Sequence, residues 1–381
     1  MRVLALEDVR RFALRDAPRP EPRANEVLLR VLAVGVCGTD FHIFDGSANF
    51  HFDTFRRPVP LIQHPLILGH EFCGRVEAAG EKAGRFVPGE MVIVDQVLNC
   101  FSQGRQPPCE YCSSGDSHQC EFGQELGITG PPGAFADYVA VPAVNVIKVP
   151  PGVSSLEAAL AEPLACVAHS IERLERAATR YSFDGNRKIR SVVVLGAGPS
   201  GLLFVQFLRR VVRFDGDILV ADSRDARLAL ARDFGGSPVD IRSEDLVERV
   251  ERQTRGAGVE CIIEASGSGK VIDAIPKVVR RQASVLLYGS GHSGLSDGCL
   301  TPLQTAELHL VTSAGASGGF DGDGTPSAYR NALDHIAARR IDVSRLVSHR
   351  YSQLSDLPEA FITGPKAVNY IKGALVRDEP A

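Results

Sequence analysis

The first 150 residues of the chain alternate short apolar runs with breaks that are rich in glycine and proline. These runs have the pattern of β-strands, and they cover Glu26–Val36, Gly74–Ala79, Glu90–Val94 and Phe135–Val141. Ser154–Ala178 has helical spacing instead, and Ser154 followed by Glu157 is typical of a capped helix start. This part of the chain is therefore predicted to be an irregular, mainly-β domain.

The pattern changes at Ser191, where apolar runs begin to alternate with helical stretches. The sequence predicts a helix at Leu202–Val212 and strands at Ser191–Leu195, Asp217–Ala221, Val259–Glu264 and Ala283–Tyr288. Strands and helices that alternate at this spacing indicate a parallel sheet covered on both faces. After His309–Ser313 the chain is rich in glycine and serine as far as Gly324, and a helix at Tyr329–Arg339 and an extended tail are expected.

The composition is that of an ordinary globular protein. The chain has 381 residues, a length sufficient for about two or three domains. Of these residues 44% are hydrophobic and 23% are charged. A net charge of −4 gives no basic field, so neither nucleic acid nor an anionic membrane is an expected partner. The start does not resemble a signal peptide, and no apolar run reaches the ~18–20 residues of a membrane span. We therefore expect a cytoplasmic protein whose cysteines bind metal rather than form disulfides.

A Gly-x-Gly-x-x-Gly motif directly follows the strand predicted to end at Leu195, and it opens a helix. Gly196 permits the tight turn, Gly198 lets the backbone approach a pyrophosphate, and Gly201 lets the helix pack closely on the strand. The motif, which includes Pro199, opens a helix whose N-terminus would present its N–H groups to phosphate oxygens. The motif predicts a dinucleotide site, and the alternative is a glycine-rich turn that binds no ligand.

Asp222 ends the next predicted strand, about 20 residues after the glycine motif. A carboxylate there accepts hydrogen bonds from the ribose hydroxyls and repels a 2′-phosphate, which favours NAD over NADP. Arg224 and Arg227 lie close by in the sequence and weaken that preference. We include Arg227 among the predicted cofactor-binding residues.

Cys109, Cys112 and Cys120 form a Cys-x2-Cys-x7-Cys pattern, and Cys100 precedes it. The chain has only 9 cysteines, so this grouping is notable. Two thiolates separated by two residues can bind one tetrahedral ion from a single turn, and Zn²⁺ prefers sulfur ligands. The cluster predicts a structural zinc site and makes a second, catalytic metal site worth searching for.

Metal-binding side chains also occur in three separate segments, as Cys37, as His70 with Glu71, and as Glu162. Cysteine, histidine and carboxylate are the ligand types of a catalytic zinc that keeps one position open. With the cysteine cluster and the glycine motif, all in this order, the chain resembles the zinc-dependent medium-chain alcohol and polyol dehydrogenases. The match covers nearly the whole chain and is strongest for the sorbitol and threonine dehydrogenase branch.

The resemblance implies an α/β two-domain fold. An irregular, mainly-β GroES-like catalytic domain would comprise residues 1–162 and be completed by residues 316–381, and a Rossmann domain with a doubly wound parallel sheet would comprise residues 163–315. It further implies a homodimer or homotetramer that uses zinc and NAD to interconvert a secondary alcohol and its ketone. The alcohol would be a polyol, sugar, cyclitol or amino alcohol. The alternatives are a primary-alcohol or formaldehyde-type dehydrogenase, or a zinc-free reductase or cofactor-binding regulator on the same scaffold.

The resemblance also implies roles for individual residues. Cys37 and His70 would be ligands of the catalytic zinc, and Glu162 stands where this branch has a glutamate. Glu71 would be a nearby carboxylate that can approach the metal or exchange with its water. Asp40 would orient His70 through its other ring nitrogen.

The same resemblance implies a path for the substrate proton. Thr39 stands where the family has the hydroxyl that passes this proton, and His42 matches the histidine that relays it to solvent. In such an enzyme the zinc polarises the alcohol oxygen and the nicotinamide accepts the hydride. The alternative for His42 is a solvated loop histidine.

The sequence departs from the family pattern in the cysteine cluster. The family has four cysteines there, and by its spacing the first would fall at Gln106, whose amide is a poor zinc ligand. Cys100 could complete the site instead, and His118 is a weaker substitute. The alternative is a lobe that has lost its ion. The remaining cysteines are predicted to be packing residues: Cys73, Cys166, Cys261 and Cys299.

A second departure is extra length between Cys37 and His70, somewhere in Asp45–His64. This segment contains aromatic rings and arginines, at Phe50, Phe52, Phe55, Arg56 and Arg57. Because it follows His42, it is expected to border the substrate site, where it could bind a sugar-like or anionic substrate. A contact between subunits is the equally weighted alternative.

Overall fold

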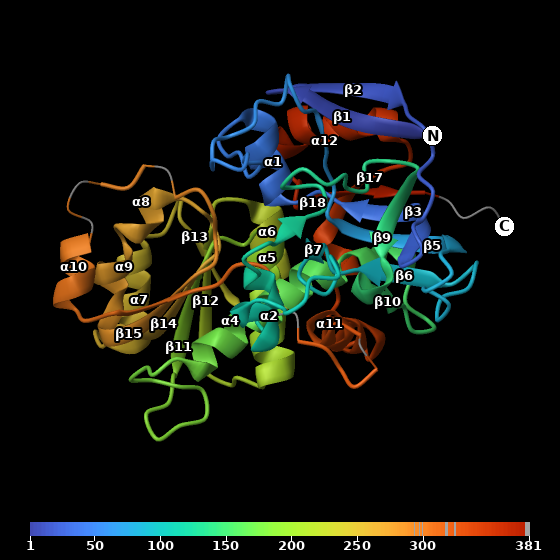
Figure 1. The fold of residues 1–381 in the computed structure, drawn as a ribbon. Helices are drawn as coiled ribbons and strands as arrows, with labels where there is room; N and C mark the ends of the chain where they lie inside the picture. The colour runs from blue at the N-terminus through green and yellow to red at the C-terminus, as the bar shows by residue number, and fades with distance from the viewer. Residues whose placement is uncertain (293, 297, 299, 317–318, 324, 378–381) are drawn as a thin grey trace. The chain divides into compact units, whose positions relative to one another are not determined.

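The computed structural model describes all residues except 293, 297, 299, 317–318, 324 and 378–381 (Figure 1). The chain divides into two compact units. The first comprises Met1–Ala165, Ala316–Arg339 and Val343–Ala381, and the second comprises Cys166–Gly315 and Arg340–Asp342. Cys299, which was predicted to be a packing residue, lies outside the described residues.

The first unit is built mainly of short strands. They are β1 (Arg2–Asp8), β2 (Arg11–Asp16), β3 (Glu26–Gly35), β4 (Leu66–Ile67), β5 (Glu71–Ala79), β6 (Met91–Val94), β7 (Val97–Leu98), β8 (Gln124–Glu125), β9 (Tyr138–Pro142), β10 (Val146–Lys148), β17 (Val347–Tyr351) and β18 (Lys372–Val376). Its helices are α1 (Gly38–Asp45), α2 (Glu110–Ser113), α3 (Ser155–Ala159), α11 (Ser327–Ala337), α12 (Leu357–Ile362) and the start of α4 (Ala161–Arg176).

The largest sheet of this unit has the strand order β10-β6-β5-β3-β18-β17, and β9 also pairs with β3. All of its pairs are antiparallel except β17 with β18. Two smaller sheets have the orders β2-β1-β4 and β7-β8. Strands β3 and β5 lie at the centre, and their register sets Gly35 opposite Glu71. This pairing positions the chain that follows β3 beside the chain that precedes β5.

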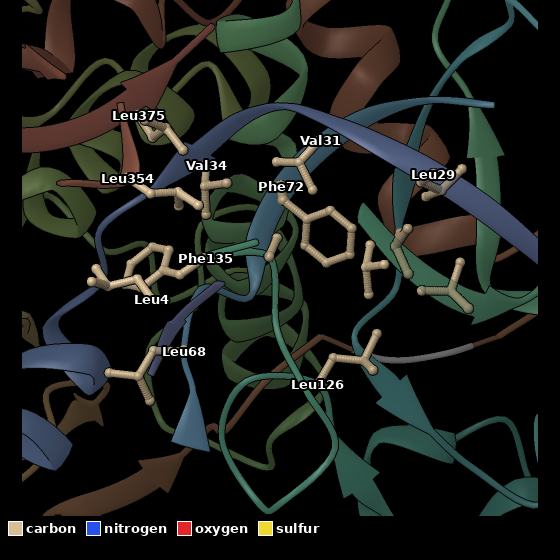
Figure 2. Close-up of a cluster of buried hydrophobic side chains, with 14 of the residues drawn as sticks. Leu4, Leu29, Val31, Val34, Leu68, Phe72, Leu126, Phe135, Leu354 and Leu375 are labelled. Atoms are coloured by element: carbon tan, nitrogen blue, oxygen red, sulfur yellow. The ribbon is translucent and has the colours of Figure 1, made fainter. Parts of the chain in front are cut away.

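The hydrophobic core of the first unit surrounds these two strands (Figure 2). Leu29, Val31 and Val34 of β3 pack in one cluster with Phe72 of β5 and with Phe135, and all five are almost completely buried. Each such side chain contributes roughly 1.5–3 kcal/mol when it leaves water. The backbone next to β3 and β5 is therefore anchored by the core.

The second unit alternates strands and helices. Its strands are β11 (Ser191–Leu195), β12 (Asp217–Asp222), β13 (Ser237–Asp240), β14 (Val259–Glu264), β15 (Val279–Leu287) and β16 (His309–Thr312). Its helices, besides most of α4, are α5 (Pro199–Phe207) with a π-helical turn at Leu208–Val212, α6 (Asp225–Asp233), α7 (Leu246–Thr254), α8 (Gly269–Ile272), α9 (Ile275–Val278) and α10 (Leu300–Thr305).

The strands of the second unit form one parallel sheet of order β13-β12-β11-β14-β15-β16. The predicted parallel sheet is thus confirmed. Strand order reverses at β11, which pairs with β12 on one side and β14 on the other. In doubly wound sheets a ligand binds beyond the carboxyl end of the strands at this reversal. No helix within the described part of the chain is long and apolar enough to cross a membrane.

Some predicted elements differ from the observed ones. The helix predicted over Ser154–Ala178 is two helices, α3 and α4, which are separated at Leu160. The helix that follows the glycine motif begins at Pro199 rather than at the predicted Leu202, because proline is well accommodated in the first turn of a helix. The prediction of an extended C-terminal tail was wrong, since β17, α12 and β18 follow α11. Strands β1 and β2 were not predicted.

Candidate metal centre and nucleotide site

Cys37 and His70 come together because β3 and β5 are neighbours. Cys37 precedes α1 just after the end of β3, and His70 directly precedes β5. The Sγ atom of Cys37, a ring nitrogen of His70 and a carboxylate oxygen of Glu71 all lie within 4.8 Å of one another. His70 and Glu71 are buried, and Cys37 is partly buried. Thiolate, imidazole and carboxylate at this spacing are a donor set that fits a zinc ion.

Asp40 lies beside two of these residues and is fully buried. Its Oδ2 atom accepts a hydrogen bond from the backbone N–H of Cys37 at 2.9 Å. Its Oδ1 atom is 3.5 Å from Nδ1 of His70, which leaves Nε2 as the nitrogen that can face a metal. A carboxylate at the other ring nitrogen is the usual support of a histidine ligand.

The electrostatics of the site favour a positive charge. Burial lowers the pKa of the His70 imidazole, but Asp40 and Cys37 outweigh it and hold the pKa well above its usual value of 6.5. A positive charge is therefore stabilised at this site, and either a proton on His70 or a bound metal ion can supply the charge. The arrangement fits the zinc that the resemblance implies.

Glu71 forms a buried ion pair that the sequence analysis did not predict. Its carboxylate lies 2.7 Å from Nζ of Lys372, which also donates to the carbonyl oxygen of Val36 at 3.1 Å. Burial lowers the pKa of Lys372, but Glu71 and Cys37 raise it to about 12. A Cβ atom at Gly35 would lie 2.0 Å from Oε2 of Glu71, so only glycine leaves room for this carboxylate.

Glu162 is not one of the three residues grouped within 4.8 Å of one another. It lies near the start of α4, is buried, and accepts a hydrogen bond from Nε2 of Gln96 at 3.1 Å. Asp95 is close enough to be affected by its charge, because burial and, to a smaller extent, the charges of Glu162 and Glu125 together raise the pKa of Asp95 to about 7. The role of Glu162 as a ligand stays a prediction.

Thr39 and His42 both belong to α1 and are partly buried. Residues three apart lie on the same face of a helix, so the two side chains are neighbours. Nδ1 of His42 lies 3.0 Å from the hydroxyl of Ser47, an exposed residue just beyond the helix. The structure therefore places the imidazole of His42 beside an exposed hydroxyl, and the relay from Thr39 to His42 stays a prediction.

The cysteine cluster has the geometry of a four-thiolate site. The Sγ atoms of Cys100, Cys109, Cys112 and Cys120 all lie within 4.8 Å of one another. Cys100 is 3.6 Å from Cys120, and it accepts a hydrogen bond from the backbone N–H of Cys109 at 3.4 Å. Backbone N–H donation from Cys112 lowers the pKa of Cys109 to about 6, while burial raises that of Cys112. Four converging sulfurs fit a tetrahedral zinc ion, and His118 is not part of the group.

In the second unit the glycine motif joins β11 to α5. Gly196 has a φ of 96°, which favours glycine, and a Cβ at Gly201 would lie 1.9 Å from the carbonyl oxygen of Gly196. Around Gly198 the nearest atom to an added Cβ is Nη1 of Arg227, at 4.0 Å. Gly198 caps α5, and Pro199 is its first residue. This open backbone at a helix N-terminus fits a pyrophosphate.

Asp222 ends β12 beside this motif. Its Oδ2 atom accepts a hydrogen bond from the backbone N–H of Ala197 at 2.8 Å, and Oδ1 accepts from the N–H groups of Ser223 and Arg224. Nη1 of Arg227 lies 3.7 Å from the carboxylate. Asp222 therefore holds the glycine loop in place, and its contact with a ribose stays a prediction.

The segment between Asp45 and His64 forms a loop with little regular structure. Arg57 is paired with Asp53 at 2.7 Å, and its guanidinium also lies over the ring of Phe55, at 5.1 Å from the centroid. Phe55 is 77% exposed. Because the charge of Arg57 is compensated within the loop, Arg56 is the better candidate for binding an anion. Both predicted roles of this loop stay open.

A parallel nucleotide-binding sheet in the same chain as a Cys–His–Glu cluster and a four-cysteine lobe defines a class, the zinc-dependent dehydrogenases that use a dinucleotide. Family models agree with this assignment. Residues 23–151 match the model of the alcohol dehydrogenase GroES-like domain, and residues 199–338 match that of the zinc-binding dehydrogenases.

Known relatives are named dehydrogenases. L-threonine 3-dehydrogenase of Anaeromyxobacter sp. (strain K) is 31% identical over 72% of this chain and 72% of its own length. Sorbitol dehydrogenase of Bacillus subtilis (strain 168) is 27% identical over 92% of this chain and 90% of its own. A zinc-binding dehydrogenase of Sinorhizobium meliloti 1021, solved with NADP, has a TM-score of 0.78 at 27% identity, with 98% of both chains covered. The chain belongs to the zinc-binding alcohol dehydrogenase family.

Several residues of the metal centre were missed by sequence reasoning. Lys372 carried a signal, because a lysine within the apolar run Tyr370–Val376 is unexpected unless it is exposed or paired. Gln96 and Asp95 carried none, since polar residues between two short strands are common in loops.

Proposed function

We propose that the protein is a zinc- and NAD-dependent dehydrogenase that interconverts a secondary alcohol and its ketone. The observation that carries this proposal is the convergence of Cys37, His70 and Glu71 in a chain that also has the nucleotide motif. The proposed substrate class is a polyol, sugar, cyclitol or amino alcohol, in line with the names of the relatives. In the proposed assembly the chain forms a homodimer or homotetramer.

In this proposal Cys37, His70 and Glu162 hold the catalytic zinc, with Glu71 as a nearby carboxylate. Zinc supplies polarisation of the alcohol oxygen, and the nicotinamide supplies the hydride acceptor. Asp40 keeps the imidazole of His70 oriented through Nδ1. Lys372 balances the charge of Glu71, so that the buried carboxylate does not remain without a partner.

The alcohol proton leaves through residues of α1. Thr39 accepts it at its hydroxyl oxygen and passes its own proton to His42. His42 contacts the hydroxyl of the exposed Ser47 at 3.0 Å, so the proton reaches solvent there. Imidazole suits this task because its pKa lies near neutral pH.

We further propose that the four-cysteine lobe holds a structural zinc and that NAD is preferred over NADP. Cys100 replaces the cysteine that the family has at the position of Gln106, and its Sγ atom lies in the group of four. Asp222 supports the preference for NAD, because its carboxylate would repel a 2′-phosphate. The NADP bound by the Sinorhizobium meliloti relative and the nearby Arg227 argue against a strict preference.

The test is an assay of NADH and NADPH formation with polyols, sugars, aminocyclitols and 3-hydroxy amino acids, and with primary alcohols and formaldehyde in parallel. Turnover of one secondary-alcohol class with NAD is the expected result. Turnover of the primary substrates alone would favour the formaldehyde-type alternative. If the protein contains no metal at Cys37 and turns over none of these, the zinc-free reductase or regulator is favoured instead.

A further inference from the structure

Glu162 is held by a chain of two buried side chains that come from distant parts of the sequence. Nε2 of Gln96 donates to Oε1 of Glu162 at 3.1 Å, and the hydroxyl of Tyr329 donates to Oε1 of Gln96. Gln96 lies between β6 and β7, and Tyr329 belongs to α11. Gln96 is 2% exposed and Tyr329 1% exposed, so solvent does not compete for these bonds.

The chemistry of the three groups gives the chain a direction. An ionised carboxylate only accepts hydrogen bonds, so the Gln96 amide must turn its NH₂ group toward Glu162. The amide oxygen then faces Tyr329, whose hydroxyl must donate. Each bond is satisfied in one arrangement only, and a reversed amide would place two acceptors against each other.

The backbone that carries Gln96 is also fixed. Its carbonyl oxygen accepts from the N–H of Leu126 at 3.0 Å. On either side, the carbonyl oxygens of Asp95 and Val97 accept from Nδ2 of the buried Asn145, at 2.8 Å each. Gln96 therefore cannot follow Glu162 if the carboxylate rotates, and the bond restrains the carboxylate.

We propose that Gln96 and Tyr329 are positioning residues, which together orient the Glu162 carboxylate for metal binding. This inference rests on the proposed function, in which Glu162 is a ligand of the catalytic zinc. Burial of an amide and a phenol hydroxyl is costly unless both are paired, and packing alone needs neither group. Hydrogen-bond partners behind a metal ligand typically change metal affinity by about 10–100-fold.

Metal affinity, measured apart from activity, tests the proposal. The protein is titrated with Zn²⁺ against a chromophoric chelator, and the ion that Cys37→Ala loses defines the catalytic site. We expect Gln96→Leu to lower the affinity for this ion by about 10–100-fold. The nearly isosteric Tyr329→Phe should lower it by a smaller factor. In the Gln96→Leu background, Tyr329→Phe should add nothing, because the two residues act through one chain. The absorption spectrum of the Co²⁺-loaded protein should change in the same variants.

Tyr351→Phe is the matched control, because Tyr351 is another buried tyrosine of the first unit. It should leave the affinity and the spectrum unchanged. If Glu162→Ala weakens binding of the ion but Gln96→Leu and Tyr329→Phe do not, the positioning role is refuted and the proposed function stands. The same holds if the effects of Gln96→Leu and Tyr329→Phe add. If wild-type protein holds no ion that depends on Cys37, the proposed function itself fails. A loss of affinity in Tyr351→Phe as large as in Tyr329→Phe would also overturn the inference.

Discussion

Among individual residues, the buried carboxyl of Asp95 has a strongly raised pKa. Burial raises its pKa from an ordinary 3.8 to about 7, with Glu162 and Glu125 as further causes. Between these two values the folded protein keeps a proton that the unfolded chain has lost. The free energy of unfolding therefore decreases as the pH rises from about 4 to about 7. Above about pH 7 the destabilisation caused by Asp95 stays constant.

Asp95→Asn should remove this cost. Oδ1 of residue 95 accepts from the N–H of Val97 at 3.0 Å, and an amide oxygen can still do so. The advantage of the variant over the wild type in free energy of unfolding should therefore grow with pH. We expect it to increase by about 3 kcal/mol between about pH 4.5 and about pH 7.5. Urea unfolding at several pH values measures this difference, and Asp16→Asn at an exposed position controls for net charge. Parallel pH profiles of Asp95→Asn and wild type would contradict the prediction.

Asp222 supports the glycine loop, and it also has a predicted role in cofactor binding. If it selects the ribose, Asp222→Ala should raise KM for NAD by about 10-fold or more and KM for NADP much less, since only NAD loses a favourable contact. Asp222→Asn separates the two tasks, because an amide oxygen can still accept from Ala197 N–H while the charge is gone. Steady-state kinetics with both cofactors measures the shift. Equal increases for NAD and NADP in both variants would mean that Asp222 only supports the loop.

Within the elements, local patterns predicted more than long-range contacts did. The glycine motif, the strands of the parallel sheet and the grouping of cysteines follow from residues close in sequence. The pairing of Lys372 with Glu71 and the contact of Tyr329 with Gln96 could not be predicted in this way, because each joins segments that only the sheet register and the position of α11 bring together. The C-terminal tail was misjudged for the same reason, since β18 is a strand by virtue of its pairing with β3.

The cysteine lobe between β7 and β8 has almost no hydrophobic core of its own, and its buried cluster consists of the cysteines themselves. A bound ion would therefore be its main source of stability. We expect metal analysis to find about two zinc ions per chain, and about one in Cys109→Ser and in Cys100→Ser. The thermal midpoint of both variants should fall by about 5 °C or more.

Cys261→Ala is the control for the lobe variants, because Cys261 is a buried cysteine of β14 in the other unit. It should keep both ions whatever its effect on stability. If Cys109→Ser loses an ion and Cys100→Ser does not, Cys100 is not the fourth ligand. One ion in the wild type, with an unchanged midpoint in Cys109→Ser, would show that the lobe binds no metal.

On the scale of the whole molecule, the chain assigns its two binding tasks to separate compact units. The proposed zinc ligands Cys37, His70 and Glu162 belong to the first unit, and the glycine motif belongs to the second. Each unit has its own hydrophobic core, so a change in one binding site should leave the other site folded. Metal binding and cofactor binding are therefore expected to be separable by mutation.

Cys37→Ala should lose turnover by at least about 10³-fold, because the proposed metal polarises the alcohol, while its Kd for NADH stays within about 2-fold of wild type. Gly198→Val should instead weaken NADH binding, and turnover with it, since a side chain at this open position would occupy the space of the pyrophosphate. It should keep both metal ions. Calorimetry and NADH fluorescence report cofactor binding, and the chain contains no tryptophan that would interfere. Normal turnover in Cys37→Ala would refute the metal mechanism, whereas loss of NADH binding in the same variant would show that the two units do not act independently.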